Sequence, residues 1–124
     1  MAGLVKLLNA AVAGTTGLGI RIGMAQPPIT IRTQGVYSFA GGTPGTQGVN
    51  IESSFDSTNG VDGNWAREIG TKGGPNDASD VQLAELFDLP TGDTAIITHT
   101  QRWIRATTGA GLVGSATVYM EFPR

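Results

Sequence analysis

Apolar residues alternate with polar or small residues along most of this chain, which is the pattern of β-strands that bury one face. The alternation is clearest over 18–24, 29–39, 49–55 and 116–122. Segments rich in Gly, Pro, Asn and Asp separate these runs, and 19 of the 124 residues are glycine. The sequence therefore predicts an all-β fold of about seven or eight strands, an antiparallel β-sandwich of the jelly-roll or Ig-like type. A closed barrel would have the same pattern.

The N-terminal segment has a different spacing. Four of its apolar residues stand at positions i, i+3, i+4 and i+7, which share one face of a helix: Leu4, Leu7, Leu8 and Ala11. With Gly14 as a C-terminal cap, this spacing predicts a short helix, or an arm that becomes ordered on a partner, within residues 1–14. The β-sandwich domain is then expected over residues 15–124. Because such an arm can dock on a neighbouring subunit, the candidate interface residues are Leu4, Leu7, Leu8 and Val12.

Residues 81–89 fit both a strand and a helical turn. Their apolar residues alternate in part, and in part recur after three or four positions. Ser79 and Gln82 have the spacing of a capping box, which favours the helix. The sequence leaves both structures open.

The composition excludes several classes of protein. Charged residues make up only 15% of the chain and the formal net charge is −2, with eight Lys and Arg that form no basic cluster. Binding to nucleic acid through its phosphates is therefore not expected. The absence of cysteine excludes disulfides, thiolate catalysis and Cys-based zinc sites. The sequence has no run of about 18 apolar residues, so no membrane span is predicted.

No pattern of catalytic residues emerges. Residues 109–114 read G-x-G-x-x-G, but a strand pattern rather than a helix follows, so we interpret them as a turn. His99 is the only histidine and lies between two threonines, without a nucleophile motif nearby. The spacing of the carboxylates does not select a glycosidase pair among Glu52, Asp56, Asp62 and Glu85. We therefore expect a protein that is not an enzyme.

The polar loop 56–64 is the one candidate for a metal site. Its side chains offer oxygen ligands of the kind that calcium prefers, from Asp56, Asn59, Asp62 and Asn64. The spacing of an EF-hand is absent, and Asp and Asn also occur in tight turns for their own hydrogen bonds. The expectation is a protein without a cofactor, with calcium as the alternative.

One segment combines aromatic and basic residues, Arg102-Trp103-Ile104-Arg105. Trp103, like Trp65 and Tyr37, can stack on a sugar ring if it is exposed, or anchor the core or an interface if it is buried. A carbohydrate-binding module that uses these aromatic residues is therefore an alternative function.

Two segments resemble hairpins of small structural proteins of tailed bacteriophages. The first runs through 49–56 and continues, after an insertion, with Asp62-Gly63-Asn64-Trp65, similar to a strand, S-x-D, D-G-x-x-W, strand pattern. The second runs through 102–109 and continues, after a glycine-containing turn, with 116–120. It is similar to a closing hairpin in which an aromatic–apolar–Arg strand leads through T-G into a T-V-x-V strand. Together these segments cover about a third of the chain.

The resemblance implies a β-sandwich present in many copies on a virion, as a capsid decoration or cement protein, or as a head–tail or tail component. It implies further copies of the chain and the major capsid or tail proteins as partners, and it transfers no catalytic residue. A β domain with few charges and many Gly and Thr residues agrees with this function, because sheet edges and termini can join neighbours.

Overall fold

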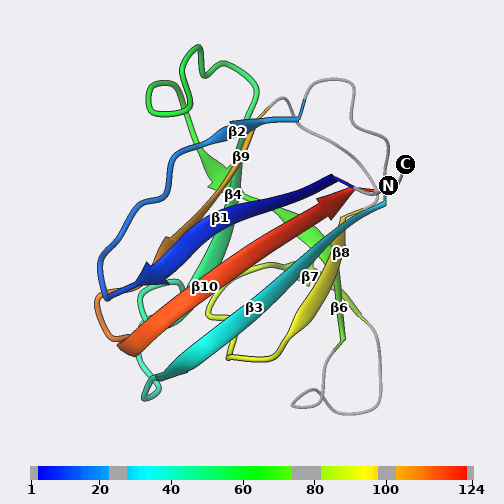
Figure 1. Cartoon of the computed structure of the whole chain (residues 1–124). Coiled ribbons are helices and arrows are strands. Elements are labelled where there is room, and N and C mark those ends of the chain that lie inside the picture. Colours follow the sequence, from blue (N-terminus) through cyan, green and yellow to red (C-terminus); the bar gives the residue numbers. More distant parts are fainter. Residues whose placement is uncertain (1–2, 23–27, 74–81, 98–102, 123–124) are drawn as a thin grey trace.

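A computed structural model describes residues 3–22, 28–73, 82–97 and 103–122, which fold into two β-sheets packed face to face (Figure 1). The strands in these residues are β1 Gly3–Ala11, β2 Ile20–Arg21, β3 Ile29–Ser38, β4 Val49–Ser54, β5 Ala66–Arg67, β6 Ile69–Gly73, β7 Gln82–Glu85, β8 Thr94–Ile97, β9 Trp103–Thr108 and β10 Val113–Phe122. This part of the chain contains no helix with the length and apolar character to cross a membrane.

The strand order is that of a jelly roll. One sheet has six strands in the order β1-β10-β3-β8-β6-β7, and the other has four in the order β2-β9-β4-β5. The antiparallel pairs β1–β10, β2–β9, β3–β8 and β4–β5 are nested in the sequence, as in a long hairpin rolled into two layers. The β6–β7 hairpin extends the larger sheet beyond β8. The predicted antiparallel sandwich is confirmed.

The core lies between the sheets and is built from alternate residues of their strands. Ile29 and Ile31 of β3 and Val118 and Met120 of β10 are fully buried, and they face Ile51, Ile104 and Ala106 of the smaller sheet. The intervening residues of β3 and β10 point away from the core, so these two strands also form an outer face of the molecule.

The predicted N-terminal helix is wrong, because Gly3–Ala11 is the strand β1 at the edge of the six-stranded sheet. Its register against β10 shifts by one residue between Lys6 and Leu8, and again between Leu8 and Ala11. These bulges turn Leu7, Leu8 and Ala11 towards the core, where each is at most 7% exposed. The extra residues break the period of two and produce the spacing that resembles a helix.

Residues 82–85 of the ambiguous segment 81–89 form strand β7, while Val81 lies outside the described residues. The chain then runs beside β4 without helical structure, and the backbones of Leu89 and Val49 form an isolated bridge. Leu86 and Leu89 are buried. The spacing resembles a helix because the strand ends within this segment and the apolar side chains of the loop that follows are also buried in the core.

Two substitutions in β1 test this correction. Leu8→Ala should lower the free energy of unfolding by about 2–4 kcal/mol, because Leu8 is buried in the core. Leu4→Ala, the control, should change it by less than about 0.5 kcal/mol, because Leu4 is 64% exposed. Urea unfolding measures both values. Equal losses would contradict the two bulges and the burial that they produce.

Candidate functional site

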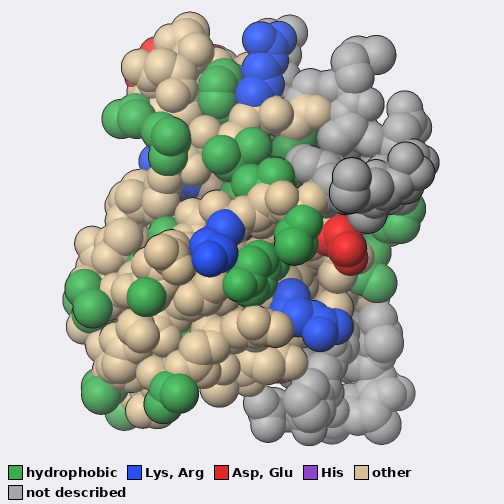
Figure 2. Space-filling model, in the orientation of Figure 1, with side chains coloured by type: hydrophobic (Ala, Val, Ile, Leu, Met, Phe, Trp, Pro, Cys, Tyr) green, Lys and Arg blue, Asp and Glu red, His purple; other side chains and the backbone are tan. Residues whose placement is uncertain are grey.

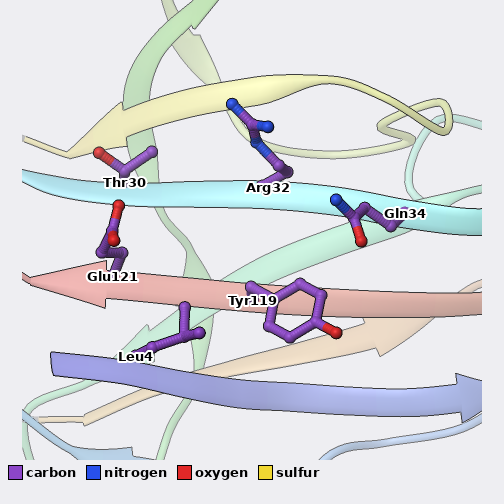
Figure 3. Close-up of a pocket in the computed structure, with 6 residues that line it drawn as sticks. All are labelled: Leu4, Thr30, Arg32, Gln34, Tyr119 and Glu121. Atoms are coloured by element: carbon purple, nitrogen blue, oxygen red, sulfur yellow. The ribbon is translucent and has the colours of Figure 1, made fainter.

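The outer face of the six-stranded sheet contains a depression of about 440 Å³ (Figure 3), lined by Leu4, Thr30, Arg32, Gln34, Tyr119 and Glu121. The register of β1, β10 and β3 places these residues in neighbouring rows. Lys6, Tyr119 and Arg32 stand side by side in one row, because Tyr119 pairs with Lys6 on one side and with Arg32 on the other. The register therefore places Tyr119 between two basic residues, and Figure 3 shows the Arg32 side chain directed away from the ring, towards β8.

The ring of Tyr119 is the centre of this depression. Figure 3 shows the ring lying flat over the sheet, with its face towards the viewer and therefore away from the core. The Nζ atom of Lys6 lies 5.6 Å from the ring centroid, a cation–π distance, and donates a hydrogen bond of 3.4 Å to the Oδ1 atom of Asn9. The ring thus lies on a paired strand with the Lys6 ammonium over it.

The polar groups around Tyr119 are available to a ligand. The side chains of Arg32, Gln34 and Glu121 and the Tyr119 hydroxyl form no hydrogen bond or ion pair with one another or with any other residue that the structure describes. They comprise donors, acceptors and both signs of charge. A molecule in the depression can satisfy these groups without first breaking a hydrogen bond or ion pair between described residues.

The other end of the same face is uncharged. The segments 7–20, 33–51 and 106–120 contain no Asp, Glu, Lys or Arg, and the fold brings them together where β1 ends, β10 begins and β3 ends. We define this uncharged end by the exposed residues Val12, Val36, Ser38 and Val113 and the half-buried Ser115. The three valines are 62%, 88% and 66% exposed. Figure 2 shows hydrophobic side chains among uncharged surface at the lower left, where these strands meet.

The structure divides the predicted interface residues. Leu7 and Leu8 lie in the core and have no surface to offer a partner, so their assignment to an interface is wrong. Leu4 is exposed and lines the depression, while Val12 belongs to the uncharged end. Two of the four predicted residues are therefore accessible: Leu4 lies near the start of β1, and Val12 directly follows its end.

The predicted aromatic residues lie in three different environments. Arg105 lies over the ring of Trp65, 4.2 Å from its centroid, and its Nε atom is 2.7 Å from the Glu52 carboxylate. Trp103 is half-buried, opposite Arg21 and Ser54 of the neighbouring strands.

Tyr37 is no stacking residue, because it is buried in the core. Its hydroxyl donates a hydrogen bond to the Leu89 carbonyl, and burial raises the pKa of Tyr37 to about 12.

The polar loop 56–64 uses its carboxylates for its own structure. Asp62 accepts hydrogen bonds from the hydroxyl and amide of Thr58 and from the Ser57 hydroxyl, and these bonds lower the pKa of Asp62 to about 2. The amide and side chain of Asn64 donate to Asp56, whose pKa is lowered for that reason.

The remaining candidates from the sequence are the other acidic residues and the histidine. Within the part of the chain that the structure describes, no three His, Cys, Asp or Glu residues are arranged to hold a metal ion. Glu52 pairs with Arg105 and Glu85 lies 3.7 Å from Arg67, so these two carboxylates have cationic partners. His99 and Arg102 lie outside the described residues.

The sequence interpretation did not select Tyr119, Arg32, Val36 or Val113. These residues occupy the positions between the core residues of β3 and β10, which a period of two assigns to solvent. The available signal was the absence of charge over 33–51 and 106–120, since an exposed strand face is usually more polar.

The fold and the outer face together define a jelly-roll β-sandwich with an open surface on its larger sheet. No protein-family model matches the sequence, and no curated protein is similar enough in sequence to match. The structure is similar to the crystal structure of the SPBc2 prophage-derived protein YomS, with a TM-score of 0.72 and 14% sequence identity. The similarity covers 98% of this chain and 92% of that chain. The resemblance to β-sandwich proteins of tailed bacteriophages is thus confirmed at the level of the fold.

A pH titration tests the geometry of the polar loop. The folded protein holds the pKa of Asp62 near 2, below the usual value of about 4 for Asp, so the ionised carboxylate contributes stability above pH 4. This contribution is lost as the pH falls through about 2. NMR titration of the side-chain carboxyl should show a midpoint of about 2.

Thr58→Val should raise that midpoint because it removes a donor, whereas Thr16→Val, on a different loop, should leave it unchanged. A midpoint near 4 in the unmodified protein would contradict the loop geometry.

Proposed function

We propose that this chain is a non-enzymatic structural protein of a tailed-bacteriophage virion, a capsid decoration or cement protein or a head–tail component. It acts through symmetric contacts between copies and through contacts with the major capsid or tail proteins. The observation that carries the proposal is the uncharged end, where two strands and the residue after β1 present three exposed valines without a charged residue in the surrounding segments.

An uncharged apolar surface favours protein contacts for two physical reasons. Interface cores are depleted of charged residues, because each buried charge must give up its hydration. Burying apolar surface contributes about 25 cal/mol per Å², and Val36, at 88% exposure, has nearly its whole side chain to bury. Because Val36 and Val113 lie on paired strands, little conformational entropy is lost on contact.

Contacts of this size become effective when they are repeated. Three valines bury a modest area, and a single contact of this kind would be transient. In a symmetric particle the same contact recurs at every copy, so the total affinity rises through multivalency. The shared fold with a prophage-derived protein supports a phage context for such an assembly.

Two charged substitutions at the uncharged end test the proposal. We expect the native chain to form oligomers, and Val36→Lys combined with Val113→Lys to shift the mass measured by light scattering to that of one chain. Val61→Lys is the control, because Val61 is 67% exposed but lies in the polar loop. The thermal unfolding midpoint of each variant shows whether it is folded. A double variant that assembles like the native chain would contradict the assignment of the uncharged end.

Point substitutions are a sharper test than removal of residues 1–14. Such a truncation would remove β1 from β10 and expose the core around Val118, so a loss of assembly would report unfolding. The valines can be changed without this effect because their side chains make few contacts within the chain.

A further inference from the structure

We infer that the depression around Tyr119 is a binding site for a saccharide that carries carboxylates, such as a chain of uronic acids. The site is independent of the uncharged end and of the tryptophans that the sequence suggested. It is carried by the orientation of the Tyr119 ring, by the free polar groups beside it and by the two cations in its row.

The ring supplies the stacking surface. Sugar rings have an apolar face of C–H groups, and the negative face of an aromatic ring attracts such weakly positive hydrogens. The Tyr119 ring lies parallel to the sheet and faces outwards (Figure 3), so a sugar that displaces the Lys6 ammonium from over the ring can lie on it without entering a closed cavity. The depression is an open groove of about 440 Å³, which suits part of a chain better than an enclosed small molecule.

The polar groups supply the hydrogen bonds. A saccharide presents neighbouring hydroxyls that both donate and accept, and Gln34 and Glu121 offer complementary atoms around the ring. The smaller sheet is different, because there Arg105 is bonded to Glu52 and Trp65 donates to the Asp62 carbonyl. In the depression, by contrast, Gln34 and Glu121 form no such bonds with other described residues and can bind a ligand.

The charges select an acidic sugar. Lys6 and Arg32 flank Tyr119 on the two neighbouring strands, and Arg32 has no ion-pair partner among the described residues. A guanidinium binds a carboxylate with two parallel hydrogen bonds, which a neutral sugar cannot form. Glu121 can accept hydrogen bonds from hydroxyls one row away. A carboxylate over Arg32 and a sugar ring over Tyr119 would use both features at once.

Calorimetric titration of the full chain with oligosaccharides of galacturonate, glucuronate and mannuronate tests the site. The methyl esters of the same oligosaccharides are the matched probes, because esterification keeps the sugar ring and removes its charge. We expect at least one acidic series to bind, about tenfold more tightly than its ester. No binding to any of the three acidic series, or equal binding of acid and ester, would overturn the inference.

Substitutions locate the site. Tyr119→Ala should weaken binding about tenfold or more, whereas Tyr119→Phe should retain it, since the phenyl ring still stacks. Arg32→Gln should reduce the affinity for the acid to that for the ester. Phe55→Ala is the control for an exposed aromatic side chain, at 66% exposure in a loop outside the depression.

Two outcomes of the substitutions would overturn the site. One is full binding by the folded Tyr119→Ala variant, and the other is loss of binding in Trp103→Ala alone. The Val36→Lys, Val113→Lys variant should bind the saccharide normally, which separates this inference from the proposed assembly.

Discussion

The pairing of β1 with β10, which joins the two ends of the chain, is the contact on which the rest of the structure depends. It closes the outermost of the nested strand pairs, and β10 then pairs with β3 on its other side. Because these partners are far apart in the sequence, their loop entropy must be overcome before their contacts stabilise the fold. The pairing holds β10 in place, with Val118 and Met120 in the core and Tyr119 on the outer face.

The polar groups on the two outer faces of the sandwich differ in whether they have hydrogen-bond partners within the chain. On the smaller sheet and its loop, Glu52, Arg105 and Trp65 form one connected cluster, and Asp62 holds the loop through its own hydrogen bonds. Such satisfied groups rigidify a surface and leave little for a partner. The larger sheet has free polar groups at one end and uncharged valines at the other. Both proposals therefore rest on this face, and they concern separate ends of it.

The sequence predicted the strands where the alternation was regular, as in β3, and it failed where the backbone departs from a regular ladder. The bulges of β1 insert extra residues at Leu7 and before Ala11, so three closely spaced side chains share one face. A linear pattern cannot separate this from a helix. The loop after β7 also produced a helix-like spacing, because Leu86 and Leu89 are buried without regular structure.

The all-β class, the positions of the regularly alternating strands β3 and β10, and the low charge follow from the amino-acid sequence alone, because they depend on residue type and on a period of two. Which surface residues lie together depends on the tertiary fold. Lys6, Tyr119 and Arg32 are far apart in the chain and become neighbours through strand register. Val36 and Val113 come together in the same way at the other end of the sheet. The physical reason is that these neighbours are joined by pairing between strands far apart in the sequence, and a slip of one residue in any pair would move its side chains to the other face.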